Sequence, residues 1–161
     1  MSPAANPFLI LLAEDEPADA HLVRTALVAN NIQAELRHVL DGREVLEYLH
    51  GQHTGFAQAL RPDLILLDLN MPRMDGHECL RAIKQDQTLR AIPTVILTTS
   101  EADRDIQASY QLGAAGYVTK PVDMEQFIEA IGILCSYWMA LVRRPAYPSQ
   151  RRDGRSVEIS Q

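Results

Sequence analysis

Several features that would place this sequence in a specialised class of protein are missing. Its 161 residues include two cysteines, Cys79 and Cys135, which provide neither a disulfide framework nor the spacing of a metal-binding pair. The longest early apolar run, Phe8 to Ala13, covers six residues, whereas a membrane span needs about 20. The first residues also lack the basic and apolar regions of a secretory signal. We therefore expect a cytoplasmic protein without a membrane segment.

The sequence also has fewer positively charged than negatively charged residues. Lysine and arginine number 15 against 21 aspartates and glutamates, which gives a net charge of −6. This excess repels phosphate backbones and anionic membranes, so no nucleic acid or lipid partner is expected. The 47 % of hydrophobic residues predicts a folded chain, and the length fits one domain with short extensions. We place the domain at 8–142, between a flexible N-terminus at 1–7 and a flexible tail at 143–161.

Five short segments have the pattern of strands. Those at 8–13, 63–67 and 94–98 are nearly unbroken aliphatic runs, as expected for strands covered by helices on both faces. A fourth lies at 116–119, and the segment at 35–40 mixes charged with apolar residues, which suits an edge strand. Helical patterns separate the strands. The alternation predicts an α/β fold with a doubly wound five-stranded parallel sheet, flavodoxin-like, in the strand order 2-1-3-4-5.

Capping residues mark where the helices begin and end. Pro17 suits the first turn of the first helix, while Asp75 and Asp123 precede acidic or amide side chains at the spacing of a capping box. Ser100 is expected to cap the fourth helix, and Gly113 to close it.

Polar residues follow the strands at the edge of the sheet where open α/β folds bind their ligands. Glu14 and Asp15 follow the first strand and Asp68 follows the third, so we expect three carboxylates to converge. Crowded carboxylates repel each other unless a cation lies among them, and Mg²⁺ is a cation that favours oxygen ligands. Lys120, after the last strand, adds a fixed positive charge, and Thr98 adds a hydroxyl after the fourth.

This set of groups is suited to phosphoryl transfer onto a carboxylate oxygen. We expect Asp68 to be the nucleophile because it lies in the middle of the sheet between charged partners. Glu14 and Asp15 are expected to hold the metal. Thr98 could donate its hydroxyl to the incoming phosphoryl group.

With these residues in place, the chain resembles the response-regulator receiver domain of two-component signalling, over about 8–138. The matching motifs are LAEDEP at 12–17, LDLNMPRMDG at 67–76, ILTTS at 96–100 and GAAGYVTKP at 113–121. The resemblance implies that Asp68 accepts a phosphoryl group from a sensor histidine kinase and that Lys120 contacts the phosphate. It also implies a metal bond from the backbone carbonyl of Asn70. Thr98 and Tyr117 would be the switch residues, and the peptide bond before Pro121 would be cis.

Two features narrow the resemblance. The long loop at 51–62 and the ending SYWMALV at 136–142 are similar to small stand-alone regulators that serve phytochrome-type histidine kinases. One position departs from the family pattern, because Thr99 stands after the switch hydroxyl where a small residue is usual. The larger side chain would slow the access of a phosphodonor or of water. Thr98 and Thr99 could share the hydroxyl role, and the choice between them depends on the spacing to Lys120.

Other functions fit parts of the pattern. A flavin or nucleotide carrier needs a glycine-rich or hydroxyl-rich loop after the first strand, whereas this loop is acidic. A haloacid-dehalogenase-like phosphatase carries Asp-x-Asp after its first strand, whereas Asp68-Leu69-Asn70 follows the third. A pseudo-receiver that only binds a partner is the remaining alternative, which the acid pair, Asp68 and Lys120 disfavour. The tail at 143–161 is too short for a DNA-reading module, so no DNA-binding output is expected.

The last helical pattern is unusually apolar. Its apolar arc covers roughly 250°, at 100° per residue, whereas a helix that packs on a sheet needs little more than about 100°. One stripe is expected to dock on the sheet: Phe127, Ile131, Leu134, Trp138 and Leu141. The surplus face, which includes Ile133 and Tyr137, predicts a homodimer built from the fourth and fifth helices and the strand between them. The alternatives are that the tail at 143–161 covers this face, or that the kinase does.

Overall fold

Five parallel strands form one sheet in the order β2-β1-β3-β4-β5 in the computed structural model, which describes residues 7–143. The strands are β1 (Phe8–Ala13), β2 (Ala34–Val39), β3 (Leu64–Leu67), β4 (Thr94–Thr98) and β5 (Gly116–Thr119). The predicted flavodoxin-like order is confirmed, and each strand begins and ends within one residue of its predicted position. The expectations for 1–6 and 144–161 lie outside the described residues.

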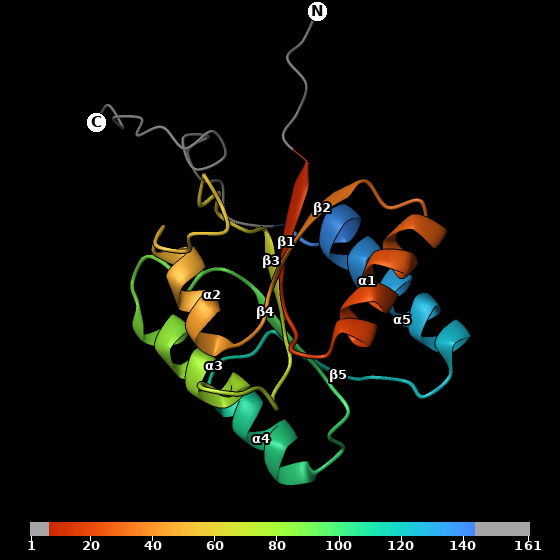
Figure 1. The fold of residues 1–161 in the computed structure, drawn as a ribbon. Coiled ribbons are helices and arrows are strands. Elements are labelled where there is room, and N and C mark those ends of the chain that lie inside the picture. Colours follow the sequence, from red (N-terminus) through yellow and green to blue (C-terminus); the bar gives the residue numbers. More distant parts are fainter. Residues whose placement is uncertain (1–6, 144–161) are drawn as a thin grey trace, which may run out of the picture.

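Helices cover both faces of this sheet. They are α1 (Pro17–Ala29), α2 (Gly42–Leu49), α3 (Gly76–Gln85), α4 (Asp103–Gln111) and α5 (Met124–Ser136). Figure 1 shows α1 and α5 together on one side of the strands, and α2, α3 and α4 on the other. This arrangement leaves the carboxyl ends of the strands uncovered by helices, as doubly wound sheets do at their ligand-binding edge. Among residues 7–143, no helix combines the length and the apolar character that a membrane crossing requires.

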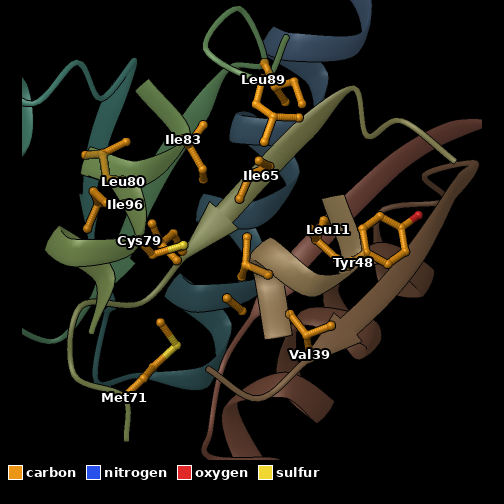
Figure 2. Close-up of a cluster of buried hydrophobic side chains, with 14 of the residues drawn as sticks. Leu11, Val39, Tyr48, Ile65, Met71, Cys79, Leu80, Ile83, Leu89 and Ile96 are labelled. Atoms are coloured by element: carbon orange, nitrogen blue, oxygen red, sulfur yellow. The ribbon is translucent and has the colours of Figure 1, made fainter. Parts of the chain in front are cut away.

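The sheet separates two hydrophobic clusters. Leu11 of β1 belongs to the cluster against α2 and α3, which Figure 2 shows in close-up, while Ile10 and Leu12 belong to the cluster against α1 and α5. All six residues of β1 are buried, because this strand lies inside the sheet with helices on both faces. The central strands are therefore a rigid base for the loops that follow them.

Most of the predicted caps are present. The side chains of Asp75 and Asp123 accept hydrogen bonds from backbone N–H groups of α3 and α5, and Gly113 follows α4 with a φ of 103°. The prediction for Ser100 is wrong, because α4 begins after Ala102, which has no side-chain oxygen. Ser100 instead accepts a hydrogen bond from the N–H of Ala102 and donates one to Asp105, so it orders the turn before the helix.

The end of α5 also departs from the expected pattern. Phe127 and Ile131 are buried as predicted, but Leu141 is 75 % exposed and does not dock on the sheet. A π-helical turn, η1 (Tyr137–Leu141), follows α5, and the N–H of Val142 donates to the carbonyl of Tyr137. This wider turn breaks the period of 3.6 residues on which the predicted stripe depended, so Leu141 points away from the core.

Candidate functional site

Three carboxylates meet at the carboxyl ends of β1 and β3. One oxygen from each of Glu14, Asp15 and Asp68 lies within 4.8 Å of the others. The two strands are neighbours in register, and the pairing continues past them because the N–H of Asp68 donates to the carbonyl of Ala13 (3.1 Å). The acids are therefore placed by the backbone of the sheet, as their positions in the sequence predicted.

Lys120 lies at the centre of the acidic groups. Its Nζ donates to Glu14, to Oδ2 of Asp19 (2.9 Å) and to Oδ2 of Asp68 (3.5 Å). Lys120, Glu14 and Asp68 are all buried. Asp15, in contrast, is exposed. All three N–H groups of the lysine are thus directed at carboxylates.

The sequence analysis missed Asp19. This residue lies in the first turn of α1, close in the sequence to Glu14 and Asp15, and this closeness to the acid pair was the signal that could have identified it. An acidic residue at a helix N-terminus is ordinarily explained by the helix dipole, which hides any further role. The contact of Asp19 with Lys120 became visible in the folded structure, where residues 101 positions apart in the sequence meet.

The electrostatics of this cluster favour a cation. Burial, together with the nearby charge of Asp68, raises the pKa of Glu14 to about 7. Burial alone would lower the pKa of Lys120, but its hydrogen bonds to Glu14 and Asp19 and the charge of Asp68 raise it instead. A single ammonium faces several carboxylates, so negative charge is left in excess and a divalent cation would neutralise it.

Thr98 lies beside this cluster in the sheet. It is the last residue of β4, it is fully buried, and its carbonyl accepts a hydrogen bond from the N–H of Lys120 (2.7 Å). Thr99, in contrast, is exposed. The structure thus places Thr98, rather than Thr99, inside the molecule next to the lysine.

Tyr117 lies in β5, and Pro121 directly follows Lys120 after the end of that strand. Tyr117 is half-buried, packs against the cluster that includes Ile96, and donates its hydroxyl to the carbonyl of Ser100 (2.9 Å). The peptide bond before Pro121 is trans, so the expected cis bond is a wrong prediction. The two forms of a bond before proline differ by only about 0.5–1 kcal/mol, so local sequence does not decide between them.

The loop after Asp68 alternates between buried and exposed residues. Leu69 and Met71 are buried in the core, whereas Asn70 between them is exposed. The N–H of Leu69 donates to Oδ1 of Asp68 (2.8 Å), which fixes the carboxylate. Gly76 is required here, because a Cβ on this residue would lie 2.3 Å from the carbonyl oxygen of Asp68. This close approach was not visible in the sequence, where Gly76 is the last residue of the motif LDLNMPRMDG and had no role assigned to it.

Comparison with known proteins points to one family. The family model for the response regulator receiver domain matches residues 10–132. Response regulator Rcp1 of Synechocystis sp. is 40 % identical over 147 residues, which cover 91 % of this chain and 99 % of Rcp1. A probable methanogenesis regulatory protein, FilR2 of Methanothrix harundinacea, is 38 % identical over 142 residues, covering 88 % of this chain and 90 % of FilR2.

Solved structures agree with this result. The phosphorylated cyanobacterial phytochrome response regulator RcpA is 40 % identical, with a TM-score of 0.81 over 88 % of this chain and 100 % of RcpA. The Mn²⁺-bound form of Rcp1 is 39 % identical, with a TM-score of 0.78 over 87 % of this chain and 100 % of Rcp1. The chain therefore belongs to the response-regulator receiver domains, signalling proteins that accept a phosphoryl group and relay it as a change of state, and it is similar to phytochrome response regulators.

Proposed function

We propose that Asp68 is the phospho-acceptor of this receiver domain. The observation that carries the proposal is the buried Asp68 carboxylate, which contacts Lys120 and lies close to the carboxylates of Glu14 and Asp15. Its Oδ1 is occupied by the N–H of Leu69, whereas Oδ2 is the oxygen directed towards Lys120. The carboxylate is therefore oriented before a phosphodonor arrives.

The transfer proceeds from a phosphohistidine of the sensor kinase. A carboxylate oxygen of Asp68 forms a bond to phosphorus as the bond from phosphorus to the imidazole nitrogen breaks, and the imidazole leaves with that electron pair. Lys120 contributes a fixed positive charge towards which the phosphoryl oxygens are drawn. Positioning and charge neutralisation provide most of the catalysis in such reactions, and both are present in this cluster.

The cofactor that fits this donor set is Mg²⁺. Three carboxylates with oxygens within 4.8 Å of one another and an excess of negative charge are suited to a hard divalent cation. Glu14, Asp15 and Asp68 would hold the ion, with the backbone carbonyl of Asn70 as a further ligand. When bound, Mg²⁺ neutralises the charge that accumulates on the transferred phosphoryl group. The Mn²⁺-bound form of Rcp1 supports a divalent metal in a protein 39 % identical to this one.

Thr98 and Tyr117 carry the response to phosphorylation. The new anion on Asp68 draws the Thr98 hydroxyl towards it, and Tyr117 then moves into the space that Thr98 leaves. A switch of this kind needs different contacts in the two states, which the phosphoryl group supplies through Thr98 and Lys120. The hydrogen bond from Tyr117 to the carbonyl of Ser100 is the contact that such a movement would break.

The partner proposed for this domain is a phytochrome-type sensor histidine kinase in the cytoplasm. Support comes from Rcp1 and RcpA, which match almost the whole of the described domain. A homodimer is proposed as well, because Ile133 and Tyr137 are 64 % and 52 % exposed on the same side of α5 and η1. Large apolar side chains exposed together are typical of an interface.

The experiment that tests the proposed function is labelling with acetyl phosphate and Mg²⁺, followed by intact mass. We expect a gain of one phosphoryl group in the parent, and no gain in Asp68→Asn or in the presence of a chelator. A pseudo-receiver would stay unlabelled under all conditions. Labelling of Asp68→Asn at a different residue would refute the assignment of the acceptor.

A further inference from the structure

The loop that follows Asp68 is hydrogen-bonded to the first residue of α2. The N–H of Gly42, the first residue of α2, donates to the carbonyl of Met74 (3.0 Å). A Cβ on Gly42 would lie 2.7 Å from that carbonyl oxygen, so the two segments are as close as a glycine permits. The loop between β3 and α3 therefore has a contact outside its own strand and helix.

An ion pair lies beside this contact. Arg73 donates from Nε to Oδ2 of Asp41 (2.7 Å) and from Nη2 to Oδ1 (3.3 Å), so its guanidinium binds the carboxylate with two nitrogens. Asp41 is 3 % exposed, and its Oδ1 also accepts the N–H of Glu44 as the cap of α2. A buried carboxylate is costly without a charged partner, so Asp41 holds Arg73 in place.

Arg73 has an unfavourable backbone conformation that its contacts must hold in place. Its φ is 63°, in the left-handed region that residues with a Cβ rarely adopt. The next residue turns tightly, because the N–H of Met74 donates to the carbonyl of Pro72 (2.7 Å). Such a conformation persists when contacts around it over-determine it, and the bidentate pair with Asp41 is one such contact.

The ion pair of Asp41 with Arg73 anchors the loop that carries Asn70 on the C-terminal side of Asn70. The loop is also anchored by Leu69 and Met71, whose side chains are buried in the core, with Met71 visible near Cys79 in Figure 2. Asn70 itself is exposed and lies three residues before Arg73. Its backbone is therefore placed by the core on one side and by the ion pair on the other.

We propose that Asp41 and Arg73 are positioning residues that keep the backbone of Asn70 beside the carboxylate cluster and thereby set the affinity of the site for Mg²⁺. The proposal rests on the metal site given above. Groups that orient metal ligands without touching the metal commonly change its affinity by 10-fold to 100-fold.

The direction in which Mg²⁺ affinity changes on removal of Arg73 distinguishes a positioning role from a purely electrostatic one. Arg73 is a cation close to a cation-binding site, so its charge acting through space opposes Mg²⁺. If that were its only influence, its removal would tighten Mg²⁺ binding. Loss of a positioning residue would weaken binding instead.

The test is calorimetric titration of the full chain with Mg²⁺, for the parent and for Arg73→Gly. Glycine adopts a φ of 63° without strain, so this variant removes the ion pair while it preserves the backbone. We expect the Mg²⁺ dissociation constant to rise about 10-fold or more. The rate of labelling by acetyl phosphate should fall at low Mg²⁺ and return to the parent rate at saturating Mg²⁺. Arg73→Lys should recover part of the affinity.

Arg43→Gln is the matched control, because Arg43 is exposed in the first turn of α2, two residues after Asp41, and its substitution also removes one positive charge. Its Mg²⁺ affinity should equal or slightly exceed that of the parent. Asp41→Asn gives a second measurement should Arg73→Gly fail to fold, since asparagine retains the oxygen that caps α2. If Arg73→Gly, or Asp41→Asn in its place, folds and binds Mg²⁺ as tightly as the parent or more tightly, the inference is overturned. The proposed function would be unaffected by that result. A parent that binds no Mg²⁺ and is not labelled would refute the proposed function itself.

Discussion

Lys120 and Asp19 form an ion pair between the end of β5 and the first turn of α1, with 2.9 Å from Nζ to Oδ2. Asp19 is the most exposed of the three carboxylates that contact this lysine, with 30 % of its side chain accessible. Under the proposed function, a phosphoryl group on Asp68 would need an N–H of Lys120, and all three are directed at carboxylates. Asp19 would then compete with the phosphoryl group for the lysine.

Asp19→Asn is expected to prolong the phosphorylated state. Without the charge of Asp19, Lys120 binds the phosphoryl oxygens more strongly, and a partly exposed ion pair of about 0.5–1 kcal/mol corresponds to a lifetime about two to five times longer. The measurement is the decay of labelled protein by intact mass after removal of the phosphodonor. Asp103→Asn, at the exposed first turn of α4, is the matched control. An unchanged or shortened lifetime in Asp19→Asn would show that the two anions do not compete.

Thr98→Ala should separate labelling from switching. Asp68, Lys120 and the acid pair stay in place, so acetyl phosphate should still label the variant. Without the hydroxyl, nothing draws β4 towards the phosphoryl group, and Tyr117 keeps its contact with Ser100. The readout is the amide spectrum of Tyr117 with and without beryllofluoride, and Thr99→Ala is the control because Thr99 is exposed. This account of the switch fails if beryllofluoride shifts the Thr98→Ala spectrum as it shifts the parent.

Ile133→Asp is expected to weaken a homodimer. Ile133 is 64 % exposed on α5, and a charge in an apolar interface is buried without a partner. A loss of about 1.4 kcal/mol or more corresponds to a dissociation constant at least about tenfold higher. Sedimentation at micromolar concentration measures this, with Val28→Asp on α1 as the control because Val28 is also an aliphatic residue and is 81 % exposed. A parent that is monomeric both before and after phosphorylation would exclude the dimer.

Asp41 should contribute to stability at neutral pH and lose that contribution in acid. Burial raises the pKa of Asp41, but the hydrogen bonds and charge of Arg73 outweigh it and hold the pKa below its ordinary value of 3.8. Because the folded state has the lower pKa, the contribution is complete above pH 3.8 and disappears as the pH falls through the folded value. Asp41→Asn should therefore lower the free energy of unfolding by about 1–2 kcal/mol at pH 6, and the gap should narrow below pH 3.8. Urea unfolding across this range measures it, and a gap of constant size would contradict the linkage.

The sequence predicted the fold well because buried parallel strands are aliphatic on both faces and the acids stand directly after them. Glu14, Asp15 and Asp68 converge for the same reason, since strand order alone brings their positions together. The contacts that the sequence did not reveal join segments that are distant along the chain. Asp19 with Lys120 is one of them. It depends on how a helix is rotated against the sheet, which hydrophobic periodicity sets only coarsely.

The ion pair of Arg73 with Asp41 was missed for a related reason. Asp41 reads as an ordinary helix cap, and Arg73 reads as an exposed arginine in a loop, so neither residue signals the other. The π-helical turn after α5 was missed because it continues a helical pattern with a different period. Local patterns therefore located the carboxylates and the lysine, but not the side chains that hold them in place.

The division of the core by the sheet has a consequence for how this protein can diverge. Tyr117 and Val118 are adjacent in β5, yet they pack on opposite clusters. Substitutions in the two clusters that share no contact should change stability additively, because each cluster is repacked without disturbing the other. Substitutions in α1 and α5 can therefore create a surface for a new binding partner, while the packing of α2, α3 and α4 against the sheet stays unchanged. Glu14, Asp15 and Asp68 directly follow strands of the dividing sheet, so substitutions on the outer face of either helical layer leave their backbone positions in place.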